Sequence, residues 1–451
     1  MKPPIKSVPT RTTDVNDNAR LGQKLIGIRK YAGMTQYELA SAAMCTQTAI
    51  HNYEKGIYPV PMDILNAIRV ATRTEGIPLK DEEVEEFKRD HYKWNRTTNY
   101  SGIGIEEVEK KLRELDRCKK LCFDADLEIF CTLFSAIYNF NVNKDDKSRK
   151  LLDSLEERKK EFTDEHKFWY YWCQGCITYW CDWRCSASLS YFLNAEKYGR
   201  RLSLDLGLDF KVLYYCTGLC YSDMDYPHKA KAYLDKIQVK LLESFNTTSY
   251  LSVQRCLAMS YSKLMQIEEA LDLLENCRAY VVREKKDDRL MLGGIYLDMG
   301  RVHQDAEDYE KALEYFDTAS QYFEKNSDAY VTYLCHKATL LRTCNKFDMV
   351  GKCLEEGLPM ATKGTLWYEW LNAIKHSLTL NNESSVKYMK WTAIPRLREY
   401  GKNLLVRDCC IWLSDHYHLT QCYKPAYEYY KEASQIYIKL MKGDMTLCKN
   451  A

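Results

Sequence analysis

The stretch AEDYEKALEYFDTAS, residues 306–320, carries the pattern that decides the fold. Its small residue Ala312 is followed by the aromatic residue Phe316 four positions later and by another small residue at +7. The same pattern, with Leu in place of the aromatic residue, recurs in QIEEALDLLENC (266–277), and it recurs with Tyr430 at +4 in KPAYEYYKEAS (424–434). Residues four apart lie on one face of a helix, and small residues let a second helix approach closely. Each copy therefore predicts a helix that packs against a neighbouring helix.

Copies of this pattern follow one another along most of the chain. Weaker ones are anchored at Ala187, Ala230, Val350 and Tyr388, and the gaps between successive anchors are 43, 40, 42, 38, 38 and 38 residues. A period near 40 without a strand pattern predicts an all-α solenoid, right-handed, of stacked helix hairpins. We expect eight hairpins, at residues 124–160, 163–200, 209–243, 249–283, 287–325, 327–361, 365–399 and 401–441.

The spacing around Ala312 resembles the tetratricopeptide repeat (TPR). Gly300 occupies the small-residue position twelve places earlier, and His303 lies where that motif prefers Tyr. The repeats are longer than the typical length of about 34 residues, which keeps a HEAT-like solenoid open as an alternative.

Composition excludes several classes of protein. The chain has 451 residues, of which 46% are hydrophobic and 28% charged, so most of it can fold around a core. Its formal net charge of +2 identifies no partner. It contains no apolar run long enough for a membrane span and no apolar secretion signal near residue 1, so we expect a cytoplasmic protein.

The cysteines are expected to be buried thiols. There are 19 of them, and in a reducing cytoplasm such residues seldom form disulfides. Pairs such as Cys173 and Cys176 have a spacing that could also serve zinc, but any helix face produces the same spacing. The sequence has no nucleotide-binding, hydrolase or metalloprotease motif. We therefore predict no enzyme activity, no catalytic residue, no metal and no cofactor.

A different pattern occupies residues 19–72, ARLGQKLIGIRKYAGMTQYELASAAMCTQTAIHNYEKGIYPVPMDILNAIRVAT. Thr35 followed by Glu38 is a capping box, which marks the start of a helix. Residues 43–45 form a turn, and Thr46 can cap the next helix. Two short helices joined by a tight turn place polar residues of the second helix in a DNA major groove.

This segment resembles the XRE/Cro-repressor type of helix-turn-helix, with Ala43 and Cys45 as departures in the turn. The resemblance implies that Gln36 holds a DNA phosphate and braces the recognition helix. It also implies base-facing roles for Gln47, Thr48 and His51, a flanking contact by Asn52, and phosphate contacts by Lys24, Arg29 and Lys55. The alternative is a small helical domain that has kept this fold without binding DNA.

These patterns divide the chain into four parts. We expect a flexible arm at 1–18, a five-helix-type helix-turn-helix domain at 19–75, a linker helix and turn at 79–104, and the TPR-like domain at 105–451. A solenoid presents a concave face lined by the first helix of each hairpin, which suits an extended peptide. The positions expected to line it are Trp172, Tyr215, Ser222, Arg255, Met259, Arg301, Gln304, Arg342, Trp370, Asp415 and His418.

The combination of an XRE-type head and a TPR array resembles the RRNPP family of peptide-pheromone receptors. The resemblance implies a quorum-sensing transcription regulator, in which a short signalling peptide binds the TPR domain and changes the arrangement of a homodimer on double-stranded DNA. Two alternatives stay open. One is an adaptor that sequesters a protein such as a response regulator or a phosphatase, and the other is a TPR regulator that responds to a protein or a metabolite.

Overall fold

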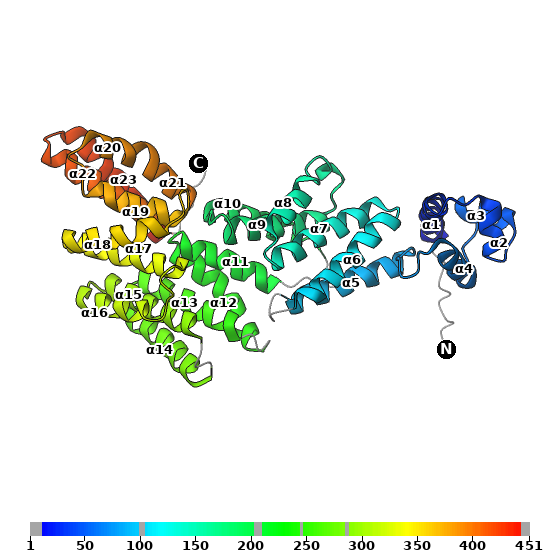
Figure 1. Cartoon of the computed structure of the whole chain (residues 1–451), viewed down its shortest axis with the longest axis horizontal. Coiled ribbons are helices and arrows are strands. Elements are labelled where there is room, and N and C mark those ends of the chain that lie inside the picture. The colour runs from blue at the N-terminus through cyan, green and yellow to red at the C-terminus, as the bar shows by residue number, and fades with distance from the viewer. Residues whose placement is uncertain (1–10, 99–103, 203–209, 244–246, 285–287, 443–451) are drawn as a thin grey trace, which may run out of the picture. The chain divides into compact units, whose positions relative to one another are not determined.

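The computed structural model describes residues 11–98, 104–202, 210–243, 247–284 and 288–442 (Figure 1). Every regular element in these ranges is a helix, which confirms the predicted all-α class. The chain forms two compact units, residues 1–173 with 197–208, and residues 174–196 with 209–451. None of the described helices is long and apolar enough to cross a membrane.

The first unit starts with four helices, which we call the head. These are α1 (Arg11–Tyr31), α2 (Gln36–Ala42), α3 (Gln47–Glu54) and α4 (Met62–Thr72). Two expectations are wrong here. Residues 11–18 belong to α1 rather than to a flexible arm, and residues 19–75 contain four helices rather than five. Residues 1–10 of that arm lie outside the described residues.

The remainder of the first unit is also helical. Its elements are α5 (Asp81–Thr98), α6 (Ile105–Leu121), α7 (Ala125–Asn141), α8 (Asp145–Asp153), the 3-10 helix η1 (Lys159–Glu161) and parts of α9 (Asp164–Trp180) and α10 (Cys185–Gly199). The predicted boundary at 104/105 does not coincide with the division between the two compact units, which falls within α9 and α10.

Helix α5, which lies in the predicted linker helix, packs into the core of the first unit. The buried His91 ring of α5 lies with Nδ1 2.8 Å from the Tyr138 hydroxyl of α7. The Tyr92 ring stacks on Trp169 of α9 with 5.6 Å between centroids. Aromatic burial of this kind fixes the helix, because each large ring removes much apolar surface from water.

The second unit continues the hairpins to the last described residue. Its helices are α11 (Phe210–Asp223), α12 (Pro227–Glu243), α13 (Thr247–Lys263), α14 (Ile267–Glu284), α15 (Arg289–Asp305), α16 (Tyr309–Ser320), α17 (Asp328–Thr343), α18 (Phe347–Met360), α19 (Leu366–Ser377), α20 (Glu383–Tyr388), the π-helical turn η3 (Met389–Ala393), α21 (Ile394–Glu399), α22 (Asn403–Leu419) and α23 (Tyr423–Lys442). Figure 1 shows α13 to α18 as successive antiparallel pairs.

One backbone feature recurs in these hairpins. A residue with left-handed φ, between 55° and 63°, lies two positions before the second helix. None of these residues is glycine, and they are Asn143, Trp183, Asp225, Met265, Glu307, Asn345 and Gln421. The same turn therefore precedes α8, α10, α12, α14, α16, α18 and α23.

Most of the predicted anchors lie where the paired helices approach each other, whereas Tyr388 is only half-buried. Ala230, Ala270, Ala312 and Val350 are fully buried, and Ala426 is buried too. Ala187 is exposed, so this anchor is wrong by one residue. The buried Ser188 takes its place, and its hydroxyl donates a hydrogen bond to the Gly175 carbonyl at 2.7 Å.

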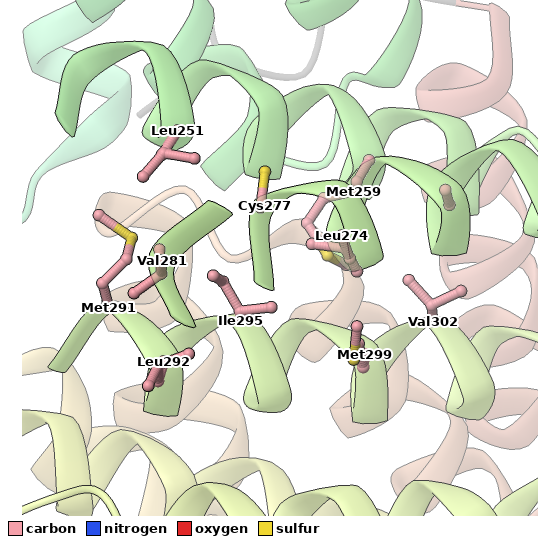
Figure 2. Packing of buried hydrophobic residues seen from close by; sticks show 12 residues of the cluster. Leu251, Met259, Leu274, Cys277, Val281, Met291, Leu292, Ile295, Met299 and Val302 are labelled. Atoms are coloured by element: carbon pink, nitrogen blue, oxygen red, sulfur yellow. The ribbon is translucent and has the colours of Figure 1, made fainter. Parts of the chain in front are cut away.

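The core of the second unit is continuous from one hairpin to the next. Figure 2 shows Leu274 and Val281 of α14 among side chains of α13 and α15. Ile295 and Met299 of α15 belong to the same buried cluster. Helix α14 therefore packs both against α13, its own partner, and against α15, the first helix of the following hairpin.

Candidate nucleic-acid and peptide sites

The head presents a short helix whose start is fixed by local hydrogen bonds. Thr35 caps α2 in a complete capping box with Glu38, as predicted. The Thr46 side chain accepts from the Ala49 amide and caps α3, also as predicted. Met44, with φ of 54°, makes the turn between the two helices.

Helix α3 has one buried and one exposed face. Ile50 and Glu54 are buried against the head, whereas Gln47, Thr48 and His51 are exposed. Two more of the predicted DNA contacts lie nearby, with Asn52 half-buried and Lys55 exposed directly after the helix. The predicted base-reading residues thus share a free polar face.

Glu54 holds three segments of the head together. Its side chain is 4% exposed and pairs with the Arg29 guanidinium of α1. The Gln36 amide of α2 donates to the Glu54 carboxylate at 2.6 Å, which supplies the bracing contact expected of Gln36. Arg29 also donates to the Met34 carbonyl at 2.9 Å. Because these contacts occupy its guanidinium, Arg29 stabilises the head and does not serve as a phosphate contact.

Lys24 has a structural role as well, which corrects its assignment to a DNA phosphate. Its side chain is 2% exposed, and Nζ lies 2.8 Å from Asp124 Oδ2 and 3.0 Å from the Leu79 carbonyl. Burial alone would raise the pKa of the Asp124 carboxyl, but the Lys24 ammonium lowers it overall. Asp124 also caps α7. Lys24 therefore ties α1 to the start of the first hairpins.

The second unit contains a pocket at the ends of three consecutive first helices. It is a small, partly open hollow with enclosed room for about one water molecule. Three residues predicted as peptide contacts line it, Ser222 of α11, Met259 of α13 and Arg301 of α15. Met259 is only 6% exposed and belongs mainly to the buried cluster of Figure 2, as Trp172 and Trp370 belong to the core. Sequence reasoning missed the other lining residues, which are Asp225, Pro227, Ser260 and Lys263.

Charges of both signs surround this pocket. Lys263 Nζ lies 2.7 Å from Asp305 Oδ1, and Arg301 Nη1 lies 3.3 Å from Asp298 Oδ1. Burial raises the pKa of the Asp225 carboxyl, and Lys263 is among the cations that limit this rise. Cationic donors and carboxylate acceptors can therefore meet a ligand at the same place.

The turn that supplies Asp225 also contacts a distant part of the same unit. The Asn403 amide donates to the Met224 carbonyl at 2.7 Å, and the Leu404 amide donates to Asp225 Oδ2 at 3.1 Å. Lys402 Nζ lies 3.4 Å from Asp223 Oδ1. These contacts join hairpins 179 residues apart and fix one wall of the pocket.

The other predicted peptide contacts do not meet at this pocket. Trp172, at 4% exposure, and Trp370, at 8%, are core residues, and Trp370 Nε1 donates to the Thr339 hydroxyl at 3.0 Å. Both are therefore withdrawn as surface contacts. The rest are spread over the second unit. Arg255 donates to Asp298 and Arg342 donates to the Ser377 hydroxyl. Tyr215 and Gln304 are half-buried, and Asp415 and His418 are exposed.

Comparisons with known proteins agree on the fold. A tetratricopeptide repeat family model matches residues 249–325, and no curated protein sequence matches the chain. NprR in complex with its cognate peptide NprX aligns with a TM-score of 0.64 at 18% identity, over 79% of this chain and 99% of that one.

Two other solved structures give the same result. A Rap protein complexed with competence and sporulation factor aligns with a TM-score of 0.64 at 16% identity, over 80% of this chain and 99% of that one. The apo form of the quorum sensor NprR from B. thuringiensis aligns with a TM-score of 0.51 at 18% identity, over 73% and 99%. The repeat array of this chain therefore has the TPR-like fold of these solved structures.

Proposed function

We propose that this chain is a cytoplasmic DNA-binding transcription regulator whose TPR-like array binds a short signalling peptide. The observation that carries the proposal is the free polar face of α3, formed by Gln47, Thr48 and His51 while the internal charges of the head are paired. Glutamine can bond bidentately to adenine, and a helix of this kind fits the major groove. Lys55, beside this face, would contact a phosphate.

The peptide half of the proposal rests on the pocket lined by Ser222, Asp225, Met259, Lys263 and Arg301. A peptide backbone offers both carbonyl acceptors and amide donors, and its carboxylates need cationic donors. The pocket has groups of each kind. NprR with its peptide NprX and the Rap complex share the fold of the array, which supports a peptide as the ligand.

Peptide binding to the array would affect DNA binding through the contacts that attach the head to the first hairpins. Because Lys24 binds Asp124 and the Leu79 carbonyl, the head follows the first hairpins rather than swinging on a free linker. A peptide that favours one arrangement of a homodimer would then set the spacing of two heads. That spacing must match half-sites about one helical turn apart on DNA.

The test is a set of DNA titrations on wild type and two head variants. His51→Ala should lose discrimination at one operator position by about 1–3 kcal/mol, because a base contact is removed. Lys55→Ala should weaken every sequence uniformly and reduce the salt slope by about one. Gln23→Ala, on an exposed part of α1, is the control.

Two outcomes would contradict parts of the proposal. If His51→Ala distinguishes every operator mutant as wild type does, α3 is not the reading helix. If the wild-type chain binds no DNA but retains a protein partner such as a response regulator, the adaptor alternative replaces it.

A further inference from the structure

Arg342, at the C-terminal end of α17, is a half-buried cation that forms no ion pair with the described residues. Its Nε donates to the Ser377 hydroxyl of α19 at 3.2 Å. Its guanidinium carbon lies 5.2 Å from the centre of the Trp412 ring of α22 and 5.4 Å from that of the Phe347 ring. These three neighbours fix the guanidinium, while its two terminal nitrogens have no hydrogen-bond partner among the described residues.

Other partly buried cations on the first helices of this unit bind carboxylates. The pairs are Arg255 with Asp298, Lys263 with Asp305, Arg301 with Asp298, Lys337 with Asp317 and Arg407 with Asp408. Burial alone would lower the pKa of Arg255 and Arg407, but their carboxylate partners raise it overall. Burial lowers the pKa of the Arg342 guanidinium, which has no such partner. Its charge is therefore the one that this row leaves uncompensated.

Arg342 continues the row of helix ends that forms the pocket. Ser222, Lys263 and Arg301 lie near the C-terminal ends of α11, α13 and α15. Helix α17 is the next first helix and packs against α15. Packed helices lie about 10 Å apart, and an extended residue spans about 3.3 Å. About three residues of an extended chain therefore reach from Arg301 to Arg342.

We propose that Arg342 binds the free C-terminal carboxylate of a peptide whose preceding residues lie along this row of helix ends. A planar guanidinium donates two parallel hydrogen bonds to a carboxylate, and aromatic neighbours hold its plane. Trp412 is 8% exposed and Phe347 is 48% exposed, so the guanidinium lies at the edge of the core, where an ion pair is stronger than in open water. The inference rests on the proposed function for the choice of a peptide as the ligand.

Asp415 supplies an independent check on the sign of the interaction. It lies one turn after Trp412 on α22, is exposed, and forms no direct ion pair with Arg342, although its charge limits the fall in the pKa of the guanidinium. A bound carboxylate would be repelled by Asp415. Removing the Asp415 charge should therefore strengthen binding, whereas removing the Arg342 charge should abolish it.

The experiment uses the full chain labelled with 5-fluorotryptophan and follows the Trp412 resonance by fluorine NMR. W412F identifies this resonance among those of the nine tryptophans. The probes are N-acetyl-triglycine, which has a terminal carboxylate, its C-terminal amide, and inorganic phosphate, all at one ionic strength. We expect the acid to shift the resonance to saturation with a Kd on the order of 1 mM. The amide should leave the resonance in place, and phosphate should bind more weakly than the acid because it makes no backbone contact.

Four variants test the assignment. R342M should weaken binding of the acid at least about tenfold, and R342K, which keeps the charge without the planar fork, should fall between R342M and wild type. D415N should tighten binding about two- to threefold. R289M is the matched control, because Arg289 also lies beside a ring, Tyr322 at 5.8 Å, but at the opposite end of a first helix. It should leave binding unchanged, and circular dichroism checks the fold of each variant.

The proposal is overturned if the acid causes no saturable shift, or if the acid and the amide act alike. Phosphate that binds as tightly as the acid would overturn the assignment to a carboxylate. Binding that R342K leaves unchanged, or that D415N weakens, would remove the charge of Arg342 as its cause. The titration needs no DNA, so a chain that binds the acid but no DNA would refute only the proposed function. A chain that reads DNA without binding the acid would refute only this inference.

Discussion

Replacing Glu54 by alanine should selectively loosen the head. Its buried carboxylate is the common partner of Arg29 on α1 and Gln36 on α2. Removing it leaves the Arg29 guanidinium without its carboxylate at a site where the side chain is 13% exposed. Breaking such a buried pair costs about 3–5 kcal/mol.

Amide hydrogen exchange of the full chain, followed by mass spectrometry, measures this loss of stability separately for each helix. A cost of about 3 kcal/mol should speed exchange of α1 to α3 amides by about two orders of magnitude. Peptides from α13 to α18 should exchange as in wild type, because they share no partner with Glu54. Specific DNA affinity should fall with the head's stability.

Two further variants control this experiment. Gln23→Ala on the exposed part of α1 should leave head exchange within a few tenths of a kcal/mol of wild type. Glu54→Gln keeps the volume and a hydrogen-bond acceptor, so it should fall between wild type and Glu54→Ala. The reasoning is refuted if Glu54→Ala leaves head exchange unchanged, or if exchange rises equally in both units.

Three other predictions follow from particular residues. Gly300→Ala should destabilise the second unit by about 1–3 kcal/mol, because a Cβ there would lie 2.5 Å from the Phe316 ring. Gly351→Ala meets only open space and should stabilise the unit by about 0.5–1 kcal/mol. Urea titrations measure both changes. Met265→Gly should raise the melting temperature and Met265→Val should lower it, since φ is 63° at this exposed residue; equal melting temperatures would contradict this. Burial lowers the pKa of the folded-state His166 imidazole to about 4. Between about pH 6.5 and 4 this imidazole is therefore protonated in the unfolded chain and neutral in the folded one, so the free energy of unfolding decreases as the pH falls. His166→Gln should flatten that part of the urea-midpoint profile, and an unchanged slope would contradict the assignment.

Local patterns predicted what depends on neighbours in the sequence. The capping box of Thr35 and Glu38 and the burial of Ala270 and Ala312 follow from spacings within one helix or one hairpin. The error at Ala187 has the same origin. Ala187 has an aromatic residue at +4 but Asn194 at +7, whereas Ser188 has Phe192 at +4 and the small Ala195 at +7. The complete pattern therefore already favoured Ser188, whose hydroxyl donates to the Gly175 carbonyl.

Long-range partners were beyond sequence reasoning. The sequence suggested a phosphate contact for Lys24, because its partner Asp124 lies 100 residues further along the chain. Helical spacing predicts that Trp370 lines the concave face, but its indole is buried and donates to the Thr339 hydroxyl. Asp225 and Lys263 were missed because they lie in a turn and at a helix end. Asp225 lies five residues before the anchor Ala230, as Met265 and Glu307 lie before Ala270 and Ala312, and this spacing is the signal that could have placed it in the turn.

The most direct test of the proposed function is a fluorescence-anisotropy titration of the purified full chain against the DNA upstream of its own gene. It should be run at two salt concentrations, with and without synthetic peptides encoded by small reading frames beside the gene. We predict specific, salt-dependent binding whose affinity one peptide shifts. Specific binding that no peptide alters would contradict the peptide response, and no DNA binding under any condition would contradict the central claim.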